Sequence, residues 1–470
     1  MKRLPPILLV LATLLCFCRL FPAEFTLLDD AQTVQHNPRL NPPTLEHLRS
    51  YWPPIRNGKV NQEFGLYMPM TYTFWSGIAA VAQTHSSDPL HPNVIELNPY
   101  LFHTANVVLH ALNGLIVFAI LRQLVKSDWP AFFGVAVFLF HPVQVEAVAW
   151  VSGAKDLLVG LFSLLAIWRY MQFATSGRKS DYAIAILSFI AALLSKPSAV
   201  TVPLILLALD FLVLRRSWRR VVPALATWFV LAALFAIIGV FAQPATEVPT
   251  PPLWARPFIV GDSLAFYVWK VLCPLHLAFD YGRRPTTIMP HVWFYLAWLV
   301  PVLIAVALWK IRARWPLISA GAVIFALAPL PTLGFLKFLF QQYSTTANHY
   351  LYIAMFGVAM VVAAVLTQIR TKALLIAATL IVIALGVLSM IQTGHWLDDR
   401  ALFTHMAHVN PQSCLAHSNL ALVALVEQKD DEARREIDLA FRSQPMSKER
   451  MEFLEKLRRD LNGTSTKPAP

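Results

Sequence analysis

Apolar stretches of roughly 20 residues recur along almost the whole of this sequence, and each is long enough to cross the hydrocarbon core of a bilayer as a helix. The chain has 470 residues, of which 57% are hydrophobic and only 14% are charged. A soluble domain of this size would carry about 25% charged residues. We therefore predict an all-α fold, in the form of a polytopic helical membrane protein.

The expected crossings number eleven, and they lie over residues 6–22, 100–124, 131–149, 156–173, 182–195, 198–214, 221–241, 290–309, 315–333, 348–369 and 373–392. Lys2 and Arg3 place the N-terminus in the cytoplasm. The basic residues of alternating short loops, such as the run over 215–220, then fall on the cytoplasmic side, as the positive-inside rule requires. Counting 67–83 or 258–276 as a crossing would invert every later loop, so we expect both to be interfacial or re-entrant helices on the outer side.

This topology leaves most of the non-spanning chain outside. The expected units are a membrane domain over 1–392, with outer loops over 29–99 and 242–289, a C-terminal helical domain over 393–455 and a disordered tail over 456–470. The C-terminal domain resembles a tetratricopeptide repeat, because small and apolar residues stand at the matching positions Leu420, Ala421, Ala433, Ala440 and Pro445. A generic helical hairpin is the alternative.

The net charge of +12 would suggest nucleic-acid binding in a soluble protein, but here the basic loops follow from the topology. The four cysteines are scattered, and their spacing indicates neither a zinc site nor a disulfide framework. The sequence has no glycine-rich phosphate loop, which argues against a cytosolic nucleotide as a sugar or phosphoryl donor.

Asp29 and Asp30 are adjacent carboxylates just after the first apolar segment, at the start of the first outer loop. Paired acids suit general-base chemistry, because one can hold the other at a useful pKa or bind a metal or a hydroxyl. The alternative is that they only cap the next helix. We take them as the leading candidates for a catalytic site.

Further polar residues stand in or beside the apolar segments, where they are energetically unfavourable unless they have partners. One helical stripe consists of His103, Asn106, His110 and Asn113. This stripe lines a cavity or holds a packing interface, and the segment HPVQVEAVAWVSGAKD adds His141, Glu146, Lys155 and Asp156 near one turn. Outward-facing basic residues form a candidate site for an anionic headgroup, and they are Lys155, Lys196, Lys270, Arg283, Arg284, Lys337 and His349.

Several long motifs carry a resemblance to a known family. They are LLDDAQTVQHNPRL, NPYLFHTANVVLHALNGLIVF, FLFHPVQVEAVAWVSGAKDLLVGLFSLLAIWRY and LLSKPSAVTVPLILLALDF, followed by the repeat-bearing tail. In this order they resemble the transmembrane-and-tetratricopeptide-repeat family of GT-C glycosyltransferases, which includes animal O-mannosyltransferases and bacterial relatives. The resemblance covers nearly the whole chain.

The resemblance implies an inverting glycosyltransferase that uses a polyprenyl-phosphate sugar, such as a mannosyl donor. It assigns the role of base on the acceptor to Asp29 or Asp30, and the phosphate contacts to Lys155, Lys196 and Arg283, with Arg284 and His349 as further candidates. Relatives commonly have Asp-Arg-Tyr where this chain has Asn348-His349-Tyr350, and a neutral histidine is a weaker phosphate ligand. His103, Asn106, His110, His141 and Glu146 are the candidate cavity-lining residues.

No cofactor is indicated by a motif, and a divalent metal is the alternative to a metal-free site. The expected partners are the lipid-linked donor and a protein, lipid or glycan acceptor, with no nucleic acid. Two other functions compete, a transporter or flippase of lipid-linked intermediates and a non-catalytic repeat scaffold. The compact chain and short tail favour a bacterial inner membrane, with the C-terminal domain in the periplasm.

Overall fold

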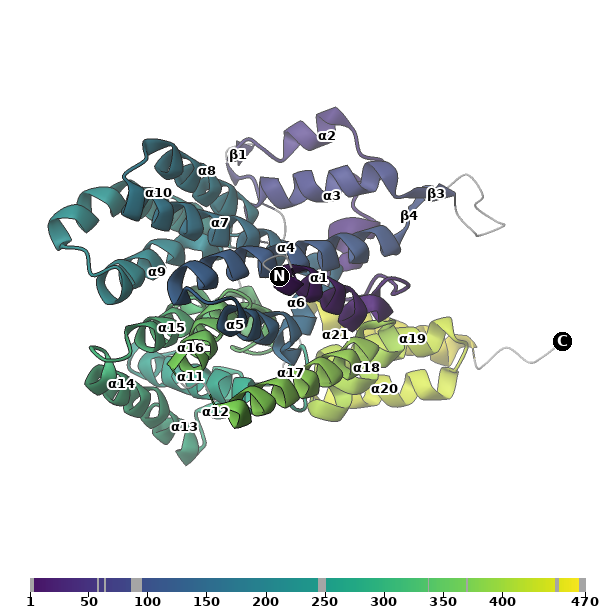
Figure 1. Cartoon of the computed structure of the whole chain (residues 1–470). Coiled ribbons are helices and arrows are strands. Elements are labelled where there is room, and N and C mark those ends of the chain that lie inside the picture. Colours follow the sequence, from purple (N-terminus) through teal and green to yellow (C-terminus); the bar gives the residue numbers. More distant parts are fainter. Residues whose placement is uncertain are drawn as a thin grey trace.

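The computed structural model describes residues 4–56, 59–62, 65–85, 95–243, 251–336, 338–368, 371–443 and 448–464. It is helical almost throughout these ranges, and its few strands are short hairpin pairs in the first loop (Figure 1). The predicted all-α, polytopic membrane fold is confirmed.

Each expected crossing coincides with a helical segment. The helices concerned are α1 (Leu4–Phe17), α4 (Pro99–Val125), α5 (Asp128–Phe140), α7 (Ala154–Ser176), α8 (Lys179–Ser195), α9 (Val202–Ala208), α10 (Trp218–Ala242), α13 (Val292–Ala297) with α14 (Leu299–Ile311), α15 (Pro316–Leu327), α16 (Ala354–Gln368) and α17 (Lys372–Thr393). Within the described ranges, five helical segments are long and apolar enough to cross a membrane, and one bent pair would make a sixth. The other expected crossings are shorter helices, so the count of eleven and the orientation stay predictions.

The expected crossing over 131–149 is not one helix. α5 ends at Phe140, and the chain continues through the 3₁₀ turn η3 (Pro142–Gln144) and α6 (Val145–Ala149) at an angle of 50°. Pro142 has no backbone N–H and disfavours a helical conformation at His141, whose φ and ψ are −77° and 129°. The bend carries Glu146 away from the axis of α5.

Three other expected crossings begin or end irregularly. The segment over 198–214 joins the 3₁₀ helix η5 (Pro197–Thr201) to α9 and closes in the π-helix η6 (Leu209–Val213). The segment over 315–333 leaves its helix at Leu327 and ends in the 3₁₀ turn η8 (Leu330–Thr332), because prolines follow. The segment over 348–369 starts with the 3₁₀ turn η10 (Asn348–Leu351) and becomes α-helical only at Ala354.

Small residues let the central helices approach closely. A side-chain carbon added at Gly357 on α16 would lie 2.2 Å from the carbonyl oxygen of Gly321 on α15, so only glycine fits at this crossing. A carbon added at Gly160 on α7 would meet the ring of Tyr352 at 2.5 Å. These contacts hold α7, α15 and α16 around the polar residues of the site.

The first outer loop forms a small layer that packs on the beginning of α7. Before it, α1 ends in the 3₁₀ turn η1 (Cys18–Leu20). The elements of the loop are the π-helix η2 (Ala31–Gln35), α2 (Leu45–Ser50), α3 (Pro69–Val81) and the antiparallel pairs β1 (Ile55–Arg56) with β2 (Lys59–Val60) and β3 (Gln83–His85) with β4 (Ile95–Leu97). In register, Ile55 lies opposite Val60 and Thr84 opposite Glu96. Trp75 of α3 is fully buried in a core that also contains Val151 and Ala154. The helix expected over 67–83 is therefore present as α3.

The second outer loop contains the helix expected over 258–276, which is observed as α11 (Arg256–Leu272). In the chain, η7 (Leu253–Ala255) precedes it and α12 (Pro285–Ile288) follows it, and the 3₁₀ helix η9 (Leu339–Gln342) comes after α15.

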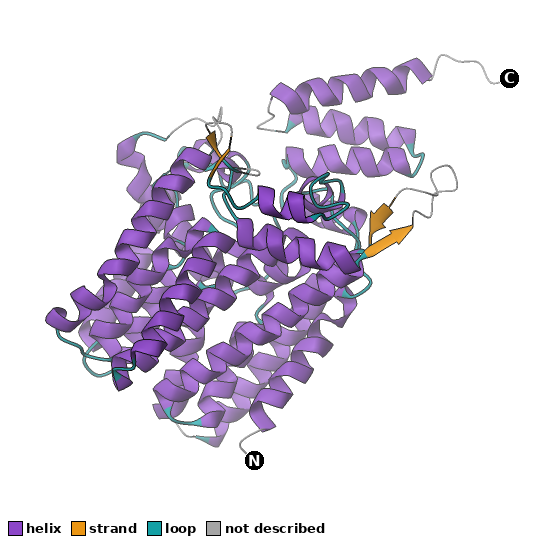
Figure 2. Ribbon diagram, turned by 90° about the horizontal axis from the view of Figure 1, so that it is seen from above, coloured by secondary structure: helices purple, strands orange, loops and turns teal. Residues whose placement is uncertain are grey.

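The C-terminal domain consists of η11 (Gly394–Trp396), α18 (Asp399–Val409), α19 (Cys414–Val426), α20 (Asp430–Arg442) and α21 (Lys448–Thr464). Figure 2 shows the last helices before the C-terminus stacked beside one another at the edge of the bundle. Among the predicted repeat positions, Leu420, Ala421, Ala433 and Ala440 are buried, whereas Pro445 lies outside the described residues. The hairpin is present, and its identity as a tetratricopeptide repeat stays a prediction.

The tail predicted to be disordered from residue 456 is helical as far as Thr464. Leu454, Leu457 and Leu461 recur on one side of α21 and pack on the core of α19 and α20, which explains the helix. This part of the prediction is wrong, and residues 465–470 lie outside the described ranges.

Candidate functional site

The two adjacent acids occupy different environments. Asp30 is fully buried, and its carboxylate accepts hydrogen bonds from the Thr26 N–H at 3.2 Å, the Thr26 hydroxyl at 2.9 Å and the Ser152 N–H at 2.8 Å. The side chain of Asp29 is 47% exposed, and its Oδ2 lies 3.8 Å from Nζ of Lys155. Burial raises the pKa of Asp30, while the hydrogen bonds from Ser152 and Thr26 lower it in part.

A second contact fixes Asp29 through its backbone. The hydroxyl of Thr33 donates a hydrogen bond to the Asp29 carbonyl at 2.7 Å and lies 2.9 Å from the hydroxyl of Ser152. Ser152 lies just before α7, and Lys155 lies in the first turn of α7. The contact of Thr33 with Ser152 therefore holds Asp29 close to Lys155. The hydrogen-bonding capacity of Asp30 is used inside the protein, whereas Asp29 can reach a ligand.

Lys155 and Lys196 bring two cations to the same region from different helices. Nζ of Lys155 lies 4.1 Å from the centre of the Trp150 ring, a cation–π contact. Lys196, which follows α8, pairs with Oδ1 of Asp156 at 2.5 Å. We call Asp29, Lys155, Asp156 and Lys196 the lysine cluster, and three of its four members are buried.

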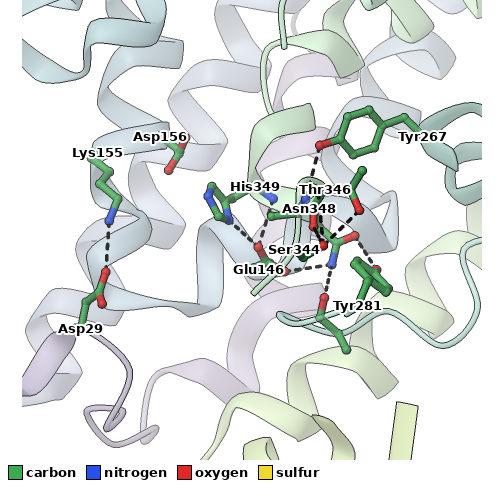
Figure 3. A network of polar contacts seen from close by, with 12 residues as sticks. Asp29, Glu146, Lys155, Asp156, Tyr267, Tyr281, Ser344, Thr346, Asn348 and His349 are labelled. Atoms are coloured by element: carbon green, nitrogen blue, oxygen red, sulfur yellow. Dashed lines mark hydrogen bonds and ion pairs between the residues drawn. The ribbon is translucent and has the colours of Figure 1, made fainter. Parts of the chain in front are cut away.

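A second group of polar residues adjoins the lysine cluster. Glu146 binds Nδ1 of His349 through Oε1 at 2.5 Å and accepts a hydrogen bond from Nδ2 of Asn348 through Oε2 at 2.8 Å. Oδ1 of Asn348 accepts a hydrogen bond from the hydroxyl of Tyr281 at 2.7 Å. α6, which carries Glu146, contacts α7, which carries Lys155 and Asp156, so the two groups are neighbours (Figure 3). We call Glu146, Tyr281, Asn348 and His349 the imidazole cluster.

Two of the remaining predicted cations have partners of their own. Arg283 pairs with Asp262 of α11 at 2.5 Å, and Lys270 donates hydrogen bonds to the carbonyls of Leu275 and His276. Burial lowers the pKa of Arg284, and nearby Asp280 opposes this effect. Among the described residues, no hydrogen bond or ion pair joins these three cations to the lysine cluster. Lys337 lies outside the described residues.

The helical stripe on α4 faces other helices. Asn106 donates hydrogen bonds to the carbonyls of Val148 and Trp150, and His110 lies within hydrogen-bonding distance of the Tyr352 hydroxyl, at 2.9 Å.

Two other residues of the predicted cavity-lining set also contact backbone carbonyls inside the protein. His103 contacts the carbonyl of Glu24 at 3.1 Å, and His141 contacts the carbonyl of Val271 at 3.0 Å. All of these side chains are buried. The contacts describe a packing interface rather than the lining of an open cavity.

Three residues of the site carry contacts that sequence reasoning did not assign to them. Ser152 binds Asp30, Asn348 binds Glu146, and Trp150 faces Lys155. Ser152 and Trp150 stand in the same motif as Lys155, and this proximity in the sequence could have indicated their part in the site. Asn348 and its partner Glu146 are about 200 residues apart, so no local pattern indicates their contact. Among the described residues, no group of three or more His, Cys, Asp or Glu side chains is arranged to hold a metal ion.

The fold and the site define a polytopic helical membrane protein with a charged cluster where its first loop meets a membrane helix. A family model described as dolichyl-phosphate-mannose-protein mannosyltransferase matches residues 102–242. The resemblance to the O-mannosyltransferase family that the motifs indicate is thereby confirmed, and individual relatives support it.

The protein O-mannosyl-transferase F38B6.6 of Caenorhabditis elegans is 24% identical over 419 residues, which cover 84% of this chain and 56% of the relative. Protein O-mannosyl-transferase TMTC4 of Mus musculus is 24% identical over 486 residues, covering 87% and 62%. Protein O-mannosyl-transferase TMTC1 of Homo sapiens is 30% identical over 179 residues, covering 36% and 18%. The chain thus spans less than two thirds of each relative, and no solved structure matches it.

Proposed function

We propose that the chain is a membrane glycosyltransferase that moves a mannose-like sugar from a polyprenyl-phosphate donor to an acceptor hydroxyl on the outer face of the membrane. The observation that carries the proposal is the pairing of a half-exposed acid with a lysine, Asp29 with Lys155, at 3.8 Å. A carboxylate that can take a proton beside a cation that can hold a phosphate is what this reaction needs.

Three members of the lysine cluster act directly in the proposed reaction. Lys155 and Lys196 contact the phosphate of the donor and stabilise the negative charge that develops on it. Asp29 takes the proton of the acceptor hydroxyl as its oxygen attacks the anomeric carbon. The bond between that carbon and the phosphate oxygen breaks on the opposite face, so the configuration inverts and the polyprenyl phosphate leaves.

The other predicted site residues act indirectly. Asp30 positions Asp29, because its carboxylate anchors the loop on Ser152. Lys196 is paired within the lysine cluster, with Asp156. In contrast, His349 is bound to Glu146 and Arg283 to Asp262, outside that cluster, so neither is assigned a direct phosphate contact.

The acceptor side is the C-terminal domain, which is joined to both outer loops. The N–H of Leu27, just before the first loop, donates to Asp399 of α18 at 2.8 Å, and Ser413 donates to Asp280 in the second loop at 2.7 Å. We propose a protein as the acceptor, because the relatives are named protein O-mannosyl-transferases. We further place the enzyme in a bacterial inner membrane, with its N-terminus cytoplasmic and its C-terminal domain in the periplasm.

The test is transfer of radiolabelled mannose from undecaprenyl or dolichyl phosphate mannose to a Ser- and Thr-rich peptide by the purified protein in nanodiscs. Asp29→Asn is expected to lower kcat by about 100-fold or more, as for the loss of a general base. Undiminished transfer by this variant would remove Asp29 from the mechanism. Movement of the lipid across the bilayer without a glycosylated product would favour a flippase, and assays with EDTA test the alternative of a divalent-metal cofactor.

A further inference from the structure

Two polar atoms beside Lys155 are buried without partners. Oδ2 of Asp156 and Nε1 of Trp150 are shielded from solvent, and within the described part of the chain neither has a hydrogen-bond partner. The residues themselves are 4% and 2% exposed. Buried polar groups are almost always satisfied in folded proteins, so these two atoms, on residues that both adjoin Lys155, require an explanation.

The two atoms are chemically complementary to a hydroxyl group. A carboxylate oxygen only accepts hydrogen bonds, and an indole N–H only donates them. A hydroxyl can donate to the first and accept from the second. Because the Trp150 ring contacts Nζ of Lys155 and Asp156 follows Lys155 in the first turn of α7, such a hydroxyl would lie beside the cation that the proposed function assigns to the donor phosphate.

The ion pair of Asp156 does not account for its second oxygen. Oδ1 binds Lys196 at 2.5 Å, which is sufficient to tie α7 to the end of α8. A comparable pair at the opposite ends of the same helices, Arg169 with Asp181 at 3.0 Å, has the same tying role. In contrast to Asp156, Asp181 leaves no carboxylate oxygen buried without a partner.

We propose that Asp156 and Trp150 form a subsite for one hydroxyl of the donor hexose, and that this subsite selects the sugar. The inference rests on the proposed function and deepens it, because it adds sugar recognition to the phosphate contact of Lys155. Oδ2 of Asp156 accepts the hydrogen bond of the hydroxyl, and Nε1 of Trp150 donates to its oxygen. A hexose that lacks this hydroxyl leaves both groups unpaired and binds more weakly.

The experiment measures the affinity of the full-length protein in nanodiscs for polyprenyl-phosphate mannose and its 2-, 3-, 4- and 6-deoxy analogues. Binding is the readout, so turnover is not required. In the wild type, one deoxy analogue is expected to bind at least about tenfold more weakly than the parent sugar. In Asp156→Asn and in Trp150→Phe, which keeps an aromatic ring but removes the N–H donor, this difference is expected to shrink to about threefold or less.

Asp181→Asn is the matched control, because it removes a charge from the equivalent ion pair at the other end of α7 and α8. It is expected to lower thermal stability as Asp156→Asn does, but to keep the full preference against the deoxy analogue. The proposal is overturned if the wild type binds all five donors equally, or if Asp156→Asn and Trp150→Phe keep the wild-type profile. A selective wild type that binds but never transfers the sugar would overturn the proposed function and leave the subsite supported.

Discussion

The carboxylate of Asp30 accepts a hydrogen bond from the backbone N–H of Ser152 at 2.8 Å, so the second acid of the pair joins the first loop to the turn that precedes α7. This contact separates two residues that are equivalent in the sequence. Asp30 is an internal anchor, and its neighbour Asp29 remains half-exposed beside Lys155. The contact also gives the loop a defined position over the lysine cluster.

The first prediction concerns this anchor. Asp30→Ala leaves the N–H of Ser152 and both donors of Thr26 unpaired in a buried place. We expect it to lower the free energy of unfolding by about 2–4 kcal/mol, because buried donors without acceptors are unfavourable. Asp30→Asn keeps an acceptor oxygen, so its loss should be smaller. Thermal unfolding in nanodiscs measures both, and equal stability of Asp30→Ala and wild type would contradict the anchoring role.

The second prediction concerns Lys155. Its ammonium group has a cation–π contact with Trp150 and a long ion pair with Asp29, so its charge is available to an anion. Lys155→Gln is expected to weaken the binding of polyprenyl phosphate by about tenfold, the typical effect of one charge-assisted contact. The uncharged polyprenol is the control ligand, and its affinity should not change. Equal weakening for both lipids would show that the variant damages the surface that binds the polyprenyl chain instead.

The third prediction concerns the imidazole cluster. Glu146 uses both carboxylate oxygens, one toward His349 and one toward Asn348, and a glutamine can offer only one acceptor oxygen. We expect Glu146→Gln to destabilise the protein by about 1–3 kcal/mol. In a double-mutant cycle with Asn348→Ala, the coupling free energy should reach about 1 kcal/mol. A control cycle pairs Glu146→Gln with Asp181→Asn, which lies at the end of another helix, and there the two changes in unfolding free energy should add. Additive changes in both cycles would contradict a hydrogen-bond network between Glu146 and Asn348.

The fourth prediction is a pH dependence in the C-terminal domain. Nδ1 of His417 lies 2.7 Å from Oε2 of Glu436, and Nε2 lies 3.0 Å from the carbonyl of Pro411. Burial lowers the pKa of His417, but the hydrogen bonds to Glu436 and Pro411 outweigh it, so the pKa is raised. Two acceptors at the two ring nitrogens suit the doubly protonated imidazolium.

The direction of the pH dependence follows because the pKa of His417 in the folded state lies above its value in the unfolded state, which is about 6.5. The stabilisation is fully present below pH 6.5 and disappears as the pH rises through the folded-state pKa. We expect a loss of about 1 kcal/mol between pH 6 and pH 9. Thermal unfolding of wild type and Glu436→Gln over this range is the measurement, and parallel pH profiles of the two proteins would refute the prediction.

Much of the architecture was predictable because it is encoded locally. Runs of apolar residues predicted where helices form, and α3, α11 and the α19–α20 hairpin lie where they were expected. The failures follow from local chemistry that hydropathy does not detect. Pro142 breaks the helix expected over 131–149, and a leucine pattern makes a helix where the polar composition after residue 456 suggested disorder.

The candidate site was predictable only in part. The sequence brings Lys155 and Asp156 together because they are neighbours in one motif, and it singles out Asp29 and Asp30 as a pair. The contacts of His349 with Glu146, and of Lys196 with Asp156, join residues that are about 200 and 40 positions apart. Such pairs depend on how the helices pack, and no periodicity in the sequence records them.

The sequence by itself determined that this chain is a helical membrane protein with an acidic pair at the start of its first loop, because burying apolar helices in lipid depends on composition and length. Only the tertiary structure decided which acid is accessible. Asp30 is buried where the backbone N–H of Ser152, in a distant turn, needs an acceptor, and Asp29 is left facing Lys155. The two acids differ in desolvation and in hydrogen bonding, and both of these depend on neighbours that are remote in the chain.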